Sequence, residues 1–197
     1  MKTLKLFLAM TFIVAMSSTL FAQDLGGDPL QGGGSTGVGT VPTTPATAAD
    51  ASALISSCQT IHTITSELGG KLQSLAAMTG NGNGNGNGNG NGNGNAAQIL
   101  QRVSEIRGLI VQLKSTGMSM TQRPVLTASI STGIQSLNAD INDIDVSFGA
   151  VENAVSNQTT IGVSAIAIYL RTRVPIVRTK GGIIRFEIRV WSDATGH

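Results

Sequence analysis

The most reactive side chains in this chain are Cys58 and His62, which stand four positions apart. On a helix this spacing places both on one side, where a thiolate and an imidazole could bind zinc or act as nucleophile and general base. Cys58 also belongs to a row of apolar residues, in which a free cysteine behaves as a small apolar side chain. A metal-binding or hydrolytic role for this pair is therefore only an alternative. The sequence predicts no catalytic residue, no metal site and no cofactor.

Three aspartates, Asp140, Asp143 and Asp145, offer the oxygen ligands that calcium prefers. They lack the glycine and the closing glutamate of a calcium-binding loop, so we predict that they form the solvated face of a helix. Residues 157–159 (Asn-Gln-Thr) match the acceptor pattern for glycosylation. Without a catalytic constellation, the chain is predicted not to be an enzyme.

Basic residues concentrate in the segment 159–197, which carries six of them against Glu187 and Asp193, a balance of +4. The six are Arg171, Arg173, Arg178, Lys180, Arg185 and Arg189. They could contact an anionic surface, such as lipid headgroups, an envelope polymer or an acidic protein. Alternatively, they keep an exposed strand edge soluble.

The first 22 residues have the pattern of a secretory signal peptide. Lys2 and Lys5 precede an apolar stretch at 6–16, and a cleavage region ends near Ala22. The chain has 13 basic and 11 acidic residues, so removing the two lysines leaves 11 of each and no net charge that would favour nucleic acid. We expect a secreted, periplasmic or envelope protein. Because it has one cysteine, no internal disulfide can hold its fold.

The middle of the chain repeats apolar residues at alternating spacings of three and four, which is typical of bundle helices and coiled coils. This pattern predicts helices at about 50–78, 96–116 and 124–156, within a bundle at 47–158. The first row is Leu54, Cys58, Ile61, Thr65, Leu68, Leu72 and Leu75. The second is Ala96, Ile99, Val103, Ile106, Ile110 and Leu113. The third is Ile130, Ile134, Leu137, Ile141, Ile144, Phe148, Val151 and Val155.

Two stretches without apolar periodicity flank and divide these helices. Residues 23–46 are rich in Gly, Pro and Thr and are predicted to be a disordered linker. Residues 80–95 are a Gly-Asn repeat, which we interpret as a low-complexity spacer. It lacks the lysine and the hydroxyl residue of a phosphate-binding loop. We therefore expect both stretches to connect the folded parts rather than to bind ligands.

Gly117 is a natural helix stop, and the short connection after it predicts an antiparallel pair of the second and third helices. Opposite charges beside the two apolar rows suggest the register. It places Arg102 near Asp140 and Arg107 near Asp145.

From about residue 160 apolar and polar residues alternate, as Ile184, Phe186 and Ile188 do with Arg185 and Glu187. This period of two predicts a basic β-hairpin over 159–197, with its turn at 178–182. The expected fold is thus mainly α, a heptad-patterned three-helix bundle or coiled coil with a C-terminal β-hairpin.

These expectations favour an exported, non-enzymatic structural or interaction protein of the cell envelope or exterior, which assembles with itself or with a partner. A membrane-associated or pore-forming assembly that uses the hairpin is one alternative. The metal-binding or hydrolytic role of Cys58 and His62 is the other.

Overall fold

The structure, a computed structural model, describes residues 45–80 and 92–196, with side chains in the second range described from residue 96. The predicted signal peptide, most of the predicted linker and the tract at 81–91 lie outside these residues. The described part forms four helices and no strand. They are α2 (Ala48–Gly80), α3 (Gly92–Thr121), α4 (Ala128–Ser156) and α5 (Val163–Thr195).

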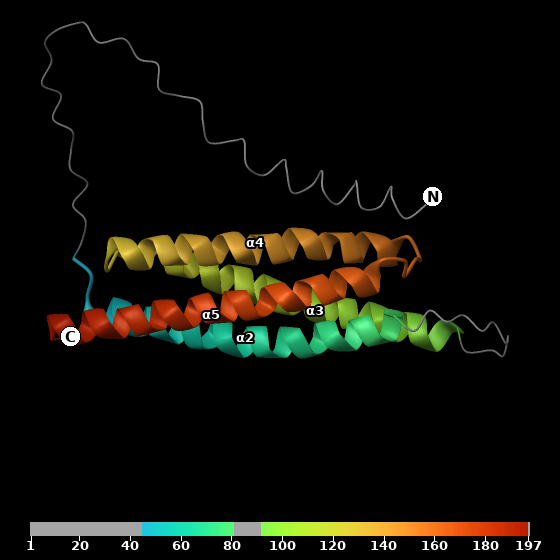
Figure 1. Cartoon of the computed structure of the whole chain (residues 1–197), viewed down its shortest axis with the longest axis horizontal. Coiled ribbons are helices and arrows are strands. Elements are labelled where there is room, and N and C mark those ends of the chain that lie inside the picture. The colour runs from blue at the N-terminus through green and yellow to red at the C-terminus, as the bar shows by residue number, and fades with distance from the viewer. Residues whose placement is uncertain (1–44, 81–91, 197) are drawn as a thin grey trace, which may run out of the picture. The chain divides into compact units, whose positions relative to one another are not determined.

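The helices pack in a ring. Helices that follow one another in the chain are in contact, and α5 closes the ring against α2. Figure 1 shows that the chain direction alternates from one helix to the next. The predicted helical bundle is therefore confirmed in its class, but it has four helices rather than three. The antiparallel pairing of α3 with α4 is also confirmed.

The apolar rows predicted from the sequence line the interior of this ring. Leu68, Ile106, Leu137 and Phe148 are completely inaccessible to solvent, and Thr65 is the buried polar member of the first row. Thr65 satisfies its hydroxyl by donating to the carbonyl oxygen of Ile61, at 2.7 Å. Across the three rows the exceptions are Ala96, which is exposed, and Val155, which is partly buried. Burial of these rows is what holds α2, α3 and α4 together.

The helices end within five residues of the predicted positions, and the end of α4 at Ser156 matches the prediction. Thr47 and Asp50 cap α2 reciprocally: the Thr47 amide donates to Asp50 Oδ2 at 3.0 Å, and the Asp50 amide donates to Thr47 Oγ1 at 3.2 Å. Thr127 caps α4 by accepting from the Ile130 amide. The predicted spacer at 80–95 is too long, since Gly80 closes α2 and α3 begins at Gly92.

The predicted C-terminal β-hairpin is wrong, because residues 163–195 form the single helix α5. Its buried residues have spacings of four and three, the same rule as the other rows. They are Val163, Ala167, Leu170, Val174, Val177, Gly181, Ile184 and Ile188. The pattern was hidden because α5 also carries apolar residues on its outer face, among them Ile168, Ile176 and Phe186. Two apolar faces of one helix, rich in β-branched residues, imitate the alternation of a strand.

Pro175 and Gly181 of α5, both unfavourable inside a helix, lie where the bundle tolerates them. Pro175 lies on the exposed face, where its missing N–H costs one helical hydrogen bond but leaves no buried group unpaired. Gly181, predicted as part of a turn, is instead buried against Ile61 of α2. A Cβ added there would lie 3.4 Å from Ile61 Cγ2, so glycine lets α5 pack closely on α2.

Gly117 also has a different role from the one predicted, because α3 continues past it to Thr121. Its carbonyl oxygen accepts a hydrogen bond of 3.0 Å from Asn138 Nδ2 of α4. The predicted register of α3 and α4 would set Ile141 opposite Ile106, but Ile141 approaches Gly117, eleven residues further along α3. The predicted register is therefore wrong.

We expect Gly117→Ala and Gly108→Ala to differ in the sign of their effects on stability. Alanine favours a helix by about 1 kcal/mol over glycine, and Gly108 has open space beside it, so Gly108→Ala should stabilise. A Cβ on Gly117 would lie 2.3 Å from Asn138 Oδ1, so Gly117→Ala should lose that gain and destabilise. Urea unfolding of both variants measures the difference. Equal stabilisation by both would contradict the close contact of α3 with α4.

Candidate functional site

The structure separates the two residues that were candidates for chemistry. Cys58 is 3% exposed in the core, whereas His62 lies exposed on α2. Burial raises the pKa of the Cys58 thiol to about 11, against a weaker opposing effect of the Arg185 charge. Within residues 45–80 and 92–196, no group of three or more His, Cys, Asp or Glu side chains is placed to hold a metal ion. Cys58 is thus positioned as a core residue and is poorly suited to act as a nucleophile.

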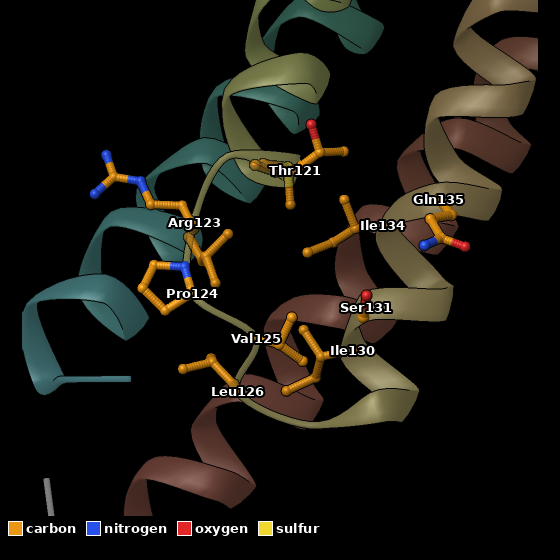
Figure 2. A pocket seen from close by; sticks show the side chains of 11 residues that line it. Thr121, Arg123, Pro124, Val125, Leu126, Ile130, Ser131, Ile134 and Gln135 are labelled. Atoms are coloured by element: carbon orange, nitrogen blue, oxygen red, sulfur yellow. The ribbon is translucent and has the colours of Figure 1, made fainter. Parts of the chain in front are cut away.

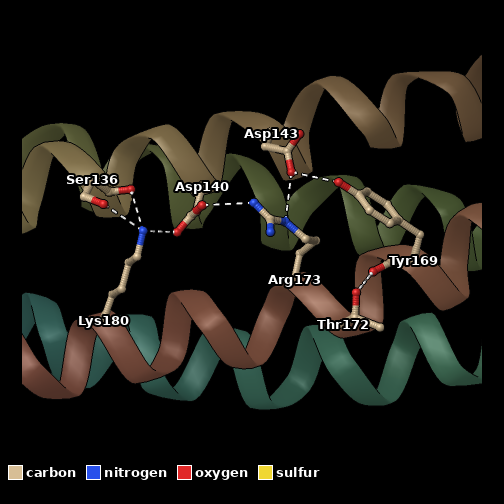
Figure 3. Close-up of polar contacts among 7 residues, drawn as sticks. All are labelled: Ser136, Asp140, Asp143, Tyr169, Thr172, Arg173 and Lys180. Carbon is tan, nitrogen blue, oxygen red and sulfur yellow. Dashed lines mark hydrogen bonds and ion pairs between the residues drawn. The ribbon is translucent and has the colours of Figure 1, made fainter. Parts of the chain in front are cut away.

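The aspartates of α4 are not a solvated face, since each binds cations of a neighbouring helix. On the side of α5, Arg173 binds Asp140 at 3.1 Å and Asp143 at 3.0 Å, as Figure 3 shows. Lys180 Nζ lies 2.5 Å from Asp140 Oδ2 and donates to Ser136 Oγ at 2.7 Å. These contacts join α4 to α5 at two points along their length.

On its other side, α4 binds the cations of α3. Arg107 pairs with both Asp145 and Glu152, and Lys114 Nζ lies 2.6 Å from Asp145 Oδ2. The Arg107 guanidinium also lies 5.2 Å from the ring centroid of Phe148, a cation–π distance. The hydrogen bond from Lys114, followed by that from Arg107, holds the pKa of Asp145 below its usual value. The predicted contact of Arg107 with Asp145 is therefore confirmed.

The predicted contact of Arg102 with Asp140 is wrong, because Asp140 is engaged by α5. Arg102 instead binds Glu105 of its own helix at 2.9 Å. Glu105 also accepts from Lys71 of α2 at 3.0 Å, and this hydrogen bond is the main reason for its lowered pKa. Ion pairs therefore connect α2 to α3, α3 to α4 and α4 to α5.

A cavity of about 70 Å³ lies beneath the loop between α3 and α4. Figure 2 shows Val125 and Ile130 close together on one side of this space, with Ile134 and Thr121 further along it. Its volume suits a few water molecules, whereas sites for small organic ligands are typically about 300–1,000 Å³. This cavity does not offer the site of a substrate or cofactor.

The outer face of α5 is the most distinctive surface of the described part. An apolar stripe runs along it with spacings of three and four, like the buried rows, but points to solvent; we call it the outer stripe. It consists of Tyr169, Thr172, Ile176, Thr179, Ile183, Phe186 and Val190. Phe186 is 67% exposed, and Ile183 is 53% exposed. The sequence contained this signal, but the β-hairpin interpretation assigned Thr179 to the turn and the other residues of the stripe to strands.

Cationic residues lie on both sides of the outer stripe. Arg173 and Lys180 occupy the side toward α4 and are engaged there, as Figure 3 shows. The opposite side, toward α2, carries a row that we call the arginine row: Arg171, Arg178 and Arg185, spaced by seven residues. Arg178 donates to Ser66 of α2 at 3.4 Å. Neither Arg171 nor Arg185 has a hydrogen bond or ion pair among the described residues.

In comparisons with known proteins, no protein family, curated protein or solved structure matches this chain.

We expect Cys58 to resist thiol reagents in the folded protein. Its thiol is buried, and a pKa of about 11 leaves far less thiolate at neutral pH than the pKa of about 8.5 of a free cysteine. Labelling with a chromogenic disulfide at neutral pH should be slow until the chain unfolds. The same protein in guanidinium chloride is the control. Rapid labelling under native conditions would contradict the burial of Cys58.

We expect Asp145 to make the stability of the bundle depend on pH in the acidic range. Its pKa is lower in the folded state, so the unfolded chain binds a proton first as the pH falls, and the free energy of unfolding declines below about pH 4. Asp145→Asn should lower stability at pH 7 by about 1 kcal/mol and reduce this acid-induced decline. Asp193→Asn, at an exposed position near the end of α5, is the control. Urea unfolding across this pH range measures the free energy of unfolding. If that free energy declined as steeply with falling pH in Asp145→Asn as in the wild type, the role of Asp145 would be disproved.

Proposed function

We propose that this chain is an exported, non-enzymatic structural or interaction protein of the cell envelope or exterior. In this proposal the four-helix bundle is a rigid support that presents the outer stripe of α5 to a partner or to another copy. The apolar interior serves the fold, and the function lies on the surface.

The observation that carries this proposal is the uneven distribution of exposed apolar side chains. Half of the large apolar side chains exposed among the described residues lie on α5, and none lies on α2. A contiguous exposed apolar surface of this kind is typical of an interaction site. Scattered exposure, in contrast, would need no explanation.

Export rests on the first 22 residues of the sequence, where Lys2 and Lys5 precede an apolar stretch. The helices α2 to α5 are each too short in apolar sequence, or too charged, to cross a membrane. The earlier alternative of a pore-forming hairpin loses its basis, because the segment 163–195 is helical.

We expect the mature protein to begin near Gln23 and to be recovered from the envelope or exterior of the producing cell. Retention there should depend on the outer stripe. The double variant Ile183→Ser/Phe186→Ser should therefore be lost from the cell fraction in which the wild type is found. Both side chains are exposed, so the melting temperature should not fall. N-terminal sequencing and cell fractionation measure these outcomes.

The matched control is Val111→Ser/Met118→Ser, which removes two equally exposed apolar side chains from α3. This control should keep the distribution of the wild type. A protein that still begins at Met1 inside the cell would refute the proposed function.

A further inference from the structure

The outer stripe lies on the side of α5 opposite its buried row. Tyr169, Ile176, Ile183 and Val190 recur every seven residues, a rise of about 10.5 Å each time, so the stripe is roughly 30 Å long. Phe186 stands between the last two of these positions and is the most exposed aromatic side chain of the described part. The apolar side chains thus occupy the line of α5 that projects furthest from the bundle.

The charges beside this stripe are matched on one side and unmatched on the other. Toward α4, Asp140 and Asp143 neutralise Arg173 and Lys180. Toward α2, no carboxylate of the described residues forms an ion pair with the arginine row. The two acidic residues of α2 are engaged elsewhere: Glu67 lies 3.6 Å from Lys71, and Asp50 lies 3.9 Å from Arg123. Arg189 adds a further exposed cation beside the stripe.

A second copy of the chain is a poor occupant for this surface. In any symmetric pairing of α5 with α5, the copy would present the same cationic flanks. The carboxylates that α5 itself could offer to the arginine row are Glu187 and Asp193, both near its end. Like charges would therefore meet over most of the contact.

The charged side chains beside the stripe favour a membrane surface over a partner helix. A stripe spaced by three and four can pack against another helix, but that helix would also have to supply carboxylates along the arginine row. A bilayer surface can receive the stripe among its headgroups, while arginine side chains on the flank extend to the phosphates.

We propose that the outer face of α5 binds the surface of membranes rich in anionic phospholipid. Ile176, Ile183 and Phe186 enter the headgroup region, and the arginine row pairs with phosphate groups. The helix lies in the plane of the surface and remains part of the bundle. This inference rests on the proposed function, in which α5 is the interaction face, and it names the partner.

The test is co-sedimentation of the exported protein with vesicles, carried out with the full mature chain. Vesicles of phosphatidylglycerol and phosphatidylcholine in equal parts should bind the protein, and vesicles of phosphatidylcholine alone should bind it much more weakly. Added salt should weaken the binding, because surface charges are screened. Binding that is equal for both kinds of vesicle would overturn the role of the arginine row.

Two variants assign the binding to α5. Ile183→Ser/Phe186→Ser should lower the affinity for anionic vesicles by about tenfold or more, since it removes apolar side chains that enter the surface. Arg171→Gln/Arg185→Gln should also weaken binding and reduce its dependence on salt. Val111→Ser/Met118→Ser and Arg123→Gln are the controls and should bind as the wild type does. If the α5 variants bound as well as these controls, the inference would be wrong.

Other outcomes separate this inference from the proposed function. If the wild type is retained in the envelope through Ile183 and Phe186 but does not bind anionic vesicles, the proposed lipid binding is wrong, and the proposal that α5 is the interaction face is kept. A dimer seen by light scattering that the double serine variant dissociates, together with no vesicle binding, would assign the face to a second copy. Failure of export refutes the proposed function, whatever the vesicles show.

Discussion

Each helix of this protein carries an apolar row that it cannot bury alone, and the ring of four is the arrangement that hides all of them at once. Side chains such as Leu68, Ile106, Leu137 and Leu170 have no access to solvent. Complete burial of one such side chain stabilises the fold by roughly 1.5–3 kcal/mol, which exceeds what an exposed ion pair contributes. The bundle therefore depends first on the apolar rows. This dependence explains how α5 remains a helix with Pro175 and two adjacent glycines inside it, because its row is needed to close the ring.

Charge complements the packing of α4 against α3 and α5. Within α4 the charged side chains are all acidic, whereas α3 and α5 are mainly basic, and α4 lies between them. Asp145 and Glu152 bind α3, and Asp140 and Asp143 bind α5. These pairs are half-buried, so each contributes modestly to the free energy of folding. Their main effect is on specificity, since they set the carboxylates of α4 against basic side chains of both α3 and α5.

The ion pairs also distinguish the two flanks of the outer face of α5. The cations of α5 that face α4 form ion pairs with Asp140 and Asp143, whereas those that face α2 form no ion pair within residues 45–80 and 96–196. An apolar stripe beside unmatched arginines has no structural purpose inside the bundle, because neither feature contributes to its core. The proposed function places recognition on this face. Burial suppresses the reactivity of Cys58, and the cavity beneath the loop between α3 and α4 is small.

The sequence by itself determined the class of the fold and nearly all of the core of α2, α3 and α4. Each of those helices has one apolar row, so its spacing of three and four predicts both the helix and the face that is buried. Only the tertiary structure decided α5, whose second apolar face imitates the alternation of a strand until α2 and α4 show which face is buried. Register was also beyond the sequence, because the contact of Asn138 with Gly117 depends on how far α3 continues. The residues of the outer stripe and the arginine row were visible in the sequence, but their common surface exists only when residues seven apart lie on one line of a helix.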